Sequence, residues 1–501
     1  MASERYDVIV VGGGSAGCAA AARLSEDPRR TVLLLESGPD PRPVPPVVDD
    51  CWKVPELWQT DYVVRYPTAR NEDASTFDSL AGRIMGGGSS VNWMNVAWPV
   101  PEDCEAWVQA GNPDWSWEHV LPVLKRIEAD QDYPDGPLHG AGGPLYVKRL
   151  QRLEQPQTGQ RQAFVDGCTS LGLPPCPDQN VPRPFGITPT PWSVKNGRRQ
   201  SAAAAYLDPA RSRPNLTIAA EAHVTALRLA GRAVEGVSYR QEGKGHVALA
   251  GEVILCAGVF HAPQILVLSG IGPPEVLAQL NIPVVTALEG VGENYQDHAV
   301  VFMRFEARDG RRDDWVVPGI AAYWKSRPDL PVSDLYLLMH RAVPAGEGQW
   351  VHVFSVRMLE HRSRGRLLFR TSDHRALPGI DPQMLVDPED LRIMEAGMRF
   401  VRDLAATEPM QAYYGRLLVP APGQDWTRFA RSHYDSFHHG IGTCKMGPAS
   451  DPTAVVDQRL RVHGVANLRI ADASILPTIP HAPTNLACMM IGERLADFLR
   501  A

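Results

Sequence analysis

The first forty residues contain two apolar runs separated by a glycine-rich turn and an alanine-rich stretch. Residues 6–11 are mostly β-branched and match a strand that is buried on both faces. Residues 12–17 read GGGSAG and lead into alanines typical of a helix, and residues 31–35 form a second buried strand that ends at Glu36. The pattern therefore predicts a strand, glycine turn, helix and strand, which together form a βαβ unit.

The spacing of the glycines gives this unit a chemical meaning. Gly12 permits a tight turn, Gly14 lets the backbone approach a pyrophosphate, and Gly17 lets the helix pack closely on the strand. Unpaired N–H groups at the start of the helix attract an anion, and Glu36 stands where it can accept hydrogen bonds from a ribose. The predicted contacts of a dinucleotide here are Gly12, Gly14, Ser15, Ala16, Gly17 and Glu36.

Two other interpretations of this turn remain open. Residues 13–17 also match GxSxG, the nucleophile elbow of α/β-hydrolases, in which Ser15 would be the nucleophile. An elbow usually lies further into the sheet and has no need of an acid at position 36. The glycines would also suit a turn that merely packs well.

Further glycine-rich segments recur along the chain. Residues 82–92 contain three successive glycines whose N–H groups can wrap a second part of a long ligand, although a flexible surface loop would have the same composition. Residues 258–272 again read as a turn entering a helix, and residues 290–298 follow. Residues 334–339 and 350–356 are rich in aromatic and aliphatic side chains and suit strands.

Composition narrows the function classes. The chain has 501 residues, of which 44% are hydrophobic and 21% charged, so it can bury one elaborated core or two. Its net charge of −7 provides no global basic field, so we expect no nucleic acid partner. The longest uncharged apolar stretch, residues 8–22, is short and interrupted by glycines, so we expect no membrane span and a cytoplasmic protein. The eight cysteines lack zinc spacing, and we expect reduced thiols and no metal.

These segments resemble the glucose-methanol-choline (GMC) oxidoreductase family, whose members are FAD-dependent and mostly oxidise alcohols. The resemblance spans the whole chain. Residues 82–107 are similar to the first family signature, with Met85 in place of the usual aliphatic residue, and residues 258–272 are similar to the second, with Val259 and Ala262 as departures.

The resemblance implies an α/β fold: a discontinuous Rossmann-like FAD-binding domain with an α+β substrate domain built on an antiparallel sheet. We place the FAD-binding domain at residues 1–145, 195–300 and 430–501, and the substrate domain at residues 146–194 and 301–429. The runs 334–339 and 350–356 would belong to the antiparallel sheet that roofs the flavin.

The resemblance also supplies a base. Removing hydride from an alcohol carbon requires that the hydroxyl proton leave too, and histidine is suited to accept it. His439, just ahead of a Gly-Thr turn, aligns with the family's catalytic histidine, although a hydrogen-bonded core histidine is the alternative. We expect His438 to face away, because neighbours on an extended chain point to opposite sides.

One position departs from the family. Relatives carry a second histidine or asparagine where this chain has Pro483, which has neither a side-chain donor nor a backbone N–H. Either His481 or Asn485 takes over the contact to the substrate oxygen as a catalytic residue, or the enzyme operates with one polar partner fewer. His481 is the favoured substitute, and Asn485 is expected as a flavin-side contact.

The cofactor implied by the resemblance is FAD, held non-covalently, because Val91 stands where relatives attach the flavin through histidine. A helix starting near residue 486 would aim its N-terminus at the flavin. The remaining predicted cofactor contacts are Arg83, Gly87, Gly88, Ser89, Asn92, Val224, Asp472, Ala473 and Asn485.

The predicted function is oxidation of a small-molecule alcohol, with proton transfer to His439, hydride transfer to flavin N5, and oxygen or another electron acceptor downstream. A lyase or decarboxylase of the same fold is the alternative, which Pro483 makes more plausible. Six aromatic residues would either line a substrate pocket or belong to the core: Trp315, Tyr323, Trp324, Trp350, Tyr413 and Tyr414.

Overall fold

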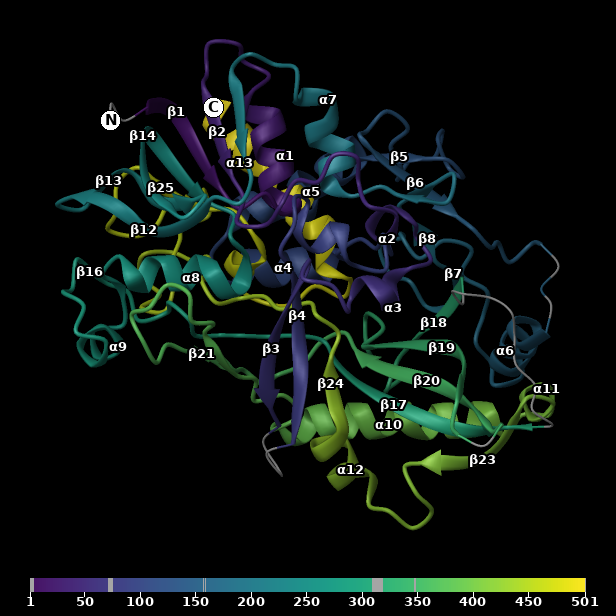
Figure 1. Ribbon diagram of the computed structural model, residues 1–501. Coiled ribbons are helices and arrows are strands. Elements are labelled where there is room, and N and C mark those ends of the chain that lie inside the picture. Colours follow the sequence, from purple (N-terminus) through teal and green to yellow (C-terminus); the bar gives the residue numbers. More distant parts are fainter. Residues whose placement is uncertain are drawn as a thin grey trace.

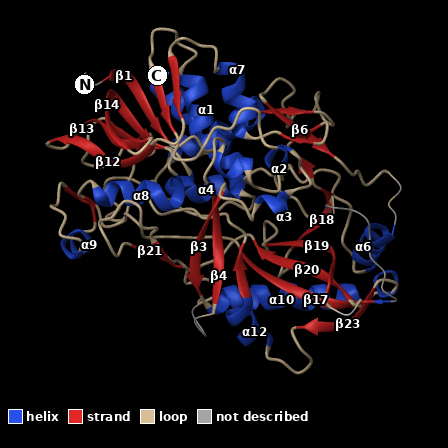
Figure 2. Cartoon of the chain, in the orientation of Figure 1, coloured by secondary structure: helices blue, strands red, loops and turns tan. Residues whose placement is uncertain are grey.

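Two sheets organise the molecule. The computed structural model describes residues 4–70, 75–155, 157, 159–308, 319–346 and 348–500, and within these residues two seven-stranded sheets lie at opposite ends of the view in Figures 1 and 2. The first sheet is mostly parallel and the second is antiparallel. This arrangement confirms the predicted fold class, a parallel-core FAD-type sheet with a separate antiparallel sheet.

The first sheet contains the predicted βαβ unit. Its strand order is β11-β2-β1-β14-β13-β12, with β25 beside β14. Residues 8–11 of β1 and all four residues of β2 are apolar and buried, as expected of strands covered on both faces. The strands are β1 (Glu4–Val11), β2 (Val32–Leu35), β11 (Leu216–Ala219), β12 (His223–Ala230), β13 (Ala233–Gln241), β14 (Lys244–Leu255) and β25 (Leu468–Ile470).

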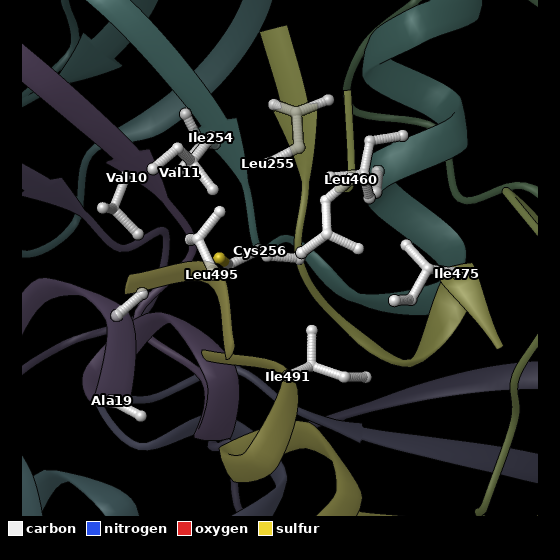
Figure 3. Close-up of a cluster of buried hydrophobic side chains, with 14 of the residues drawn as sticks. Val10, Val11, Ala19, Ile254, Leu255, Cys256, Leu460, Ile475, Ile491 and Leu495 are labelled. Carbon is white, nitrogen blue, oxygen red and sulfur yellow. The ribbon is translucent and has the colours of Figure 1, made fainter. Parts of the chain in front are cut away.

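Two helices from opposite ends of the sequence pack together on this sheet. They are α1 (Ser15–Leu24) and α13 (Thr484–Arg500), the purple and yellow helices near the top of Figure 1. A Cβ on Gly492 would lie 2.4 Å from the Ala16 carbonyl oxygen, so only glycine allows this approach. Figure 3 shows part of the core beneath them, where side chains of β1 and β14 meet those of α1 and α13.

The second sheet separates an apolar core from a cavity. Its strand order is β23-β17-β20-β19-β18-β7, with β24 beside β17. Alternate side chains such as Leu337 and Val356 face the core beneath α10 (Pro388–Ala405), while Tyr336 and Arg357 face the first sheet. The strands are β7 (Gly186–Pro189), β17 (Ala299–Ala307), β18 (Ile320–Trp324), β19 (Leu335–Pro344), β20 (Trp350–Met358), β23 (Tyr414–Val419) and β24 (Tyr434–Ser436).

The two runs predicted to be roof strands form β19 and β20, which pair with each other in antiparallel register. The domain boundaries stay a prediction, and β24 is one strand that crosses between the two sheets' regions. That strand lies within residues 430–501, which were assigned to the FAD-binding domain, and it pairs with β17 of the second sheet.

The hairpin of β3 (Val63–Ala69) and β4 (Thr76–Gly82) runs from the first sheet's region down to the second (Figure 1). No helix within the described residues is long and apolar enough to cross a membrane. The other helices and strands are α2 (Pro46–Asp49), α3 (Val54–Leu57), α4 (Pro101–Gln109), α5 (Trp117–Ile127), α6 (Gly159–Ser170), α7 (Asp208–Ala210), α8 (Gly258–Leu268), α9 (Pro274–Gln279), α11 (Glu408–Gln411), α12 (Trp426–His433), β5 (Glu128–Asp130), β6 (Leu145–Arg149), β8 (Pro191–Trp192), β9 (Val194–Lys195), β10 (Arg198–Arg199), β15 (Ile271–Gly272), β16 (Thr286–Ala287), β21 (Arg366–Leu368) and β22 (Gly379–Asp381).

Candidate active site

A cavity of about 920 Å³ lies between the two sheets. The carboxyl ends of β1, β2 and β14 and the N-termini of α1, α8 and α13 line one side, and β19 and β20 line the other. Ligands of open α/β sheets bind at this carboxyl edge, so the cavity has the position expected of a cofactor and substrate site.

The turn after β1 forms an anion cradle. Gly12 has a φ of +104°, which favours glycine, and a Cβ on Gly17 would lie 1.9 Å from the Gly12 carbonyl oxygen. A Cβ on Gly14 would meet nothing within 4 Å and would occupy the cavity instead. Gly12, Gly14, Ser15 and Ala16 line the cavity, whereas Gly17 packs the helix against the strand.

Glu36 lies at the end of β2 with its carboxylate in the cavity wall. Its oxygens accept hydrogen bonds from the N–H groups of Gly13 and Gly38, each at 2.7 Å. Burial nevertheless raises the pKa of Glu36 to about 7. Each carboxylate oxygen retains a lone pair that can accept from a ribose hydroxyl.

The second glycine segment closes over this turn. Gly87 approaches Gly14 so closely that a Cβ on Gly87 would lie 2.7 Å from the Gly14 Cα. Arg83, Gly87, Gly88 and Asn92 line the cavity.

Ser89 is not brought to the cavity. Its hydroxyl donates to the Gly86 carbonyl at 2.6 Å and accepts from the Ala202 N–H at 2.8 Å, so it fixes the loop from behind. Asn92 has a loop role as well as a place in the wall, because its Oδ1 accepts from the Met94 N–H at 2.9 Å.

The remaining predicted cofactor contacts also reach the cavity wall. Asp472 accepts hydrogen bonds from the N–H groups of Gly258 and Ser474, which hold its carboxylate beside the start of α8. Ala473, Val224 and Asn485 line the cavity too.

These residues fit an FAD molecule. Gly14 and Gly88 face open space that a side chain would fill, two helix N-termini offer N–H groups to a diphosphate, and Glu36 offers acceptors to a ribose. Ser15 Oγ donates to Asn485 Oδ1 at 2.6 Å and so joins the starts of α1 and α13. That contact, with no described histidine bonded to Ser15, also argues against the nucleophile elbow.

Two histidines form a chain beside the cavity. His439 Nδ1 lies 2.8 Å from His298 Nδ1, and His298 Nε2 lies 3.0 Å from the Pro480 carbonyl oxygen. Burial lowers the pKa of both imidazoles well below the ordinary value, and the charge of Arg357 lowers both further. Both rings are therefore neutral.

The partners fix which nitrogens carry protons. A carbonyl only accepts, so His298 Nε2 donates to Pro480, and the Nδ1 of this neutral ring must accept. His439 Nδ1 therefore donates to His298. His439 is left with an unprotonated Nε2, which is the atom that a base needs. Asp297, whose pKa burial raises to about 6, accepts from the His439 backbone N–H at 2.9 Å and holds this segment in place.

The expectation that His438 faces away is wrong. His438 has a φ of +61°, so the backbone is not extended there, and both His438 and His439 line the cavity. His438 Nδ1 accepts from the Leu80 N–H at 3.2 Å, and its ring packs edge-on against Trp58.

Pro483 lines the cavity, and His481 does not. The His481 ring is turned to Asp103, and its Nδ1 lies 2.6 Å from the Asp103 Oδ1. Burial lowers the pKa of His481, but the Asp103 carboxylate outweighs burial and raises this pKa to about 10. The structure therefore offers no support for His481 as the second contact to the substrate oxygen.

The aromatic side chains of the cavity differ from those suggested by the sequence. Trp315 lies outside the described residues, and none of Tyr323, Trp324, Trp350, Tyr413 and Tyr414 is among the described residues that line the cavity. The lining aromatic residues are Trp58, Tyr66, Trp93, Trp192, Phe260, Tyr336 and Phe437.

A separate group of buried charges, the Arg149 cluster, lies outside the cavity wall. Oxygen and nitrogen atoms of Glu128, Asp130 and His139 lie within 4.8 Å of one another, a spacing that would suit a metal ion. The positive charge there comes from the protein itself, because Arg149 pairs with Asp130 at 2.9 Å and His139 lies 2.8 Å from Glu128. Asp178 completes the cluster by accepting from both cations.

Comparisons with known proteins agree with this geometry. A family model described as GMC oxidoreductase matches residues 6–300, and a second model of that description matches residues 361–492. Choline oxidase of Arthrobacter globiformis is 34% identical over 541 aligned residues, which cover 100% of this chain and 95% of the relative. A 5-(hydroxymethyl)furfural oxidase of Methylovorus sp. (strain MP688) is 35% identical over 535 residues, covering 99% of each protein. Among solved structures, pyridoxine 4-oxidase from Mesorbium loti has a TM-score of 0.91 and 29% identity, covering 98% of both chains.

Proposed function

Because the chain belongs to the GMC oxidoreductase family, whose members bind FAD, we propose that it oxidises a small alcohol with His439 as the base. The observation that carries this proposal is the series of hydrogen bonds from the Pro480 carbonyl through His298 to His439. These hydrogen bonds leave the unprotonated Nε2 of a neutral His439 ring free at the cavity. The names of the relatives, choline oxidase and 5-(hydroxymethyl)furfural oxidase, are consistent with an alcohol as substrate.

A bound FAD would supply the acceptor for the hydride that leaves the alcohol carbon. The protein's part is to receive the hydroxyl proton at His439 Nε2, which becomes the second N–H of that ring. His298 holds the other nitrogen throughout, so the ring cannot turn its protonated side to the substrate. The proton is then released to solvent or to the electron acceptor.

We further propose that FAD is held without a covalent bond. Val91, in the cavity wall, has no side-chain atom able to form one. The contacts that would hold the cofactor are the Gly14 and Gly88 backbone, Glu36 and the starts of α1 and α13.

The test is anaerobic reduction of the flavin by primary, aromatic and sugar alcohols, followed as bleaching of its visible band. We expect His439→Asn to slow bleaching by about 100- to 10,000-fold, the usual contribution of a general base. The variant should retain FAD, and acid precipitation should release all of it to the supernatant. His433→Asn on the exposed end of α12 is the matched control and should bleach at the parental rate.

A second set of variants tests whether His298 positions the His439 ring. His298→Gln keeps an acceptor for His439 Nδ1, whereas His298→Leu removes it, so Gln should retain more activity than Leu. The pH dependence of bleaching should shift only in His298→Leu. A parental rate in His439→Asn would contradict the proposed base. A flavin that no alcohol bleaches would favour the lyase or decarboxylase alternative.

A further inference from the structure

Arg357 is a buried cation in the wall of the proposed active site. It lies on β20 with 1% of its surface exposed and faces the cavity. Its guanidinium carbon is 4.2 Å from the ring centre of Tyr336, its cross-strand neighbour, and 4.7 Å from that of Phe437. The guanidinium is thus within cation–π distance of two aromatic rings.

Two nitrogens of the guanidinium, Nε and Nη2, are buried and have no hydrogen-bond partner among the described residues. Arg357 also forms no ion pair with any described carboxylate. Burial lowers its pKa, yet a guanidinium remains charged at any working pH. Stacking on aromatic rings compensates only part of the lost hydration, because rings do not accept the in-plane N–H bonds.

The position of this cation relates it to the base. The Phe437 ring that stacks on Arg357 also contacts the His439 ring at 5.3 Å between centres, and the Arg357 charge lowers the pKa of His439. Arg341 adds a second positive charge to the same side of the cavity. Three acids are among the described lining residues. Glu36 and Asp472 belong to the opposite, cofactor side. Asp297 lies beside the base, where its carboxylate accepts hydrogen bonds from Tyr295, Ser436 and the His439 N–H.

We propose that Arg357 binds a carboxylate on the substrate, so that the enzyme oxidises alcohols that carry a carboxylate group. This inference rests on the proposed alcohol oxidation. Nε and Nη2 are themselves buried, so the contact with the ligand falls to the remaining nitrogen, Nη1, whose N–H groups can donate a charge-assisted hydrogen bond to a carboxylate oxygen in the cavity. The hydroxyl of the same molecule then reaches His439 Nε2 beside Phe437.

The same geometry disfavours choline. Quaternary ammonium groups are recognised by aromatic cages, and here Tyr336 and Phe437 are already in contact with the protein's own guanidinium. A cationic substrate would also be repelled by Arg357.

The experiment compares 4-(hydroxymethyl)benzoate with its uncharged methyl ester in the anaerobic flavin assay. The parent should prefer the carboxylate in kcat/KM, and choline should bleach the flavin poorly. Arg357→Met should lower kcat/KM for the carboxylate by about 100-fold while changing the ester little, because truncating one partner of a buried charge pair has an effect of this size. Arg304→Met, an exposed position on β17 of the same sheet, is the matched control and should preserve the preference.

A binding measurement separates this proposal from the proposed function. Benzoate and benzamide cannot be oxidised, and their binding is followed by the change in flavin absorbance. Benzoate should bind more tightly than benzamide to the parent and lose that advantage in Arg357→Met. If alcohols bleach the flavin but benzoate binds the parent and Arg357→Met equally, the role of Arg357 is refuted and alcohol oxidation stands. If no alcohol bleaches the flavin but benzoate binding depends on Arg357, anion recognition stands and alcohol oxidation is refuted.

Discussion

Arg149 and Arg357 are buried to nearly the same extent, at 2% and 1% exposure, and both stack on an aromatic ring. Arg149 is surrounded by carboxylates, pairing with Asp130 at 2.9 Å and Asp178 at 2.5 Å. Arg357 has no carboxylate partner among the described residues. A buried cation supplied with its counter-ions stabilises the fold, whereas one left without them is placed to meet a ligand. The contrast separates a structural site from a functional one without reference to any relative.

The largest difference is expected when each of the two arginines is replaced by methionine. Arg149→Met leaves Asp130 and Asp178 buried without their partner and should lower the free energy of unfolding by about 3–5 kcal/mol. Arg357→Met removes an unpaired charge and leaves no orphaned acid, so the free energy of unfolding should change by about 1 kcal/mol or less, or rise. Urea unfolding of the FAD-loaded proteins measures both. Equal destabilisation by the two variants would show that Arg357 is as structural as Arg149.

A smaller difference is expected in the response to pH. Burial disfavours charged His139, but hydrogen bonds to Asp178 and Glu128 outweigh it and raise its pKa to about 9. The stabilisation from His139 is therefore complete below about pH 6.5 and is lost as the pH rises through 9, up to about 3 kcal/mol in all.

The cavity histidines change stability with pH in the opposite direction to His139. His298 and His439 have lowered pKa values, so the unfolded chain takes up protons that the folded protein does not, and their effect is to lower stability as the pH falls below about 6.5. Melting temperatures of the parent and His139→Gln should converge between pH 6.5 and 9. A gap that stays constant across that range would contradict a charged His139.

The smallest effects concern the stacked rings. Tyr133→Leu removes the ring 4.5 Å from the Arg149 guanidinium and should lower the free energy of unfolding by about 0.5–1 kcal/mol. Phe437→Leu should instead weaken benzoate binding by about 2- to 5-fold, since the ring orients Arg357 for a ligand. If Phe437→Leu altered unfolding alone, its stacking would be structural like that of Tyr133.

Local patterns explain what the sequence could predict. The strand, glycine turn, helix and strand of residues 6–36 and the strands β19 and β20 depend on periodicity over a few residues, and they form as expected. His439 was found from its motif, and the cavity wall contains it.

The contacts that were missed are between distant residues or depend on one backbone angle. His481 is held by Asp103, 378 positions away, and His298 meets Pro480, 182 positions away. No spacing rule reports such partners. The prediction that His438 faces away from the cavity failed because its left-handed φ breaks the alternation of side chains that an extended chain would have. The sequence contains one indication of Arg357, a charged side chain in the largely apolar strand β20. That this side chain lacks an acceptor among the described residues can be seen only in the structure.

The bond between Ser15 and Asn485 has a consequence for biosynthesis. These residues are 470 positions apart, so the ribosome completes the nucleotide-binding turn long before the second wall of the site. At about 5–20 residues per second, roughly 20–90 s pass between the two events. During that interval the nascent chain has the glycine turn but lacks α13, so the complete cofactor site forms only after α13 has been synthesised. Any truncation that removes α13 would therefore yield a chain that is translated normally and never turns yellow.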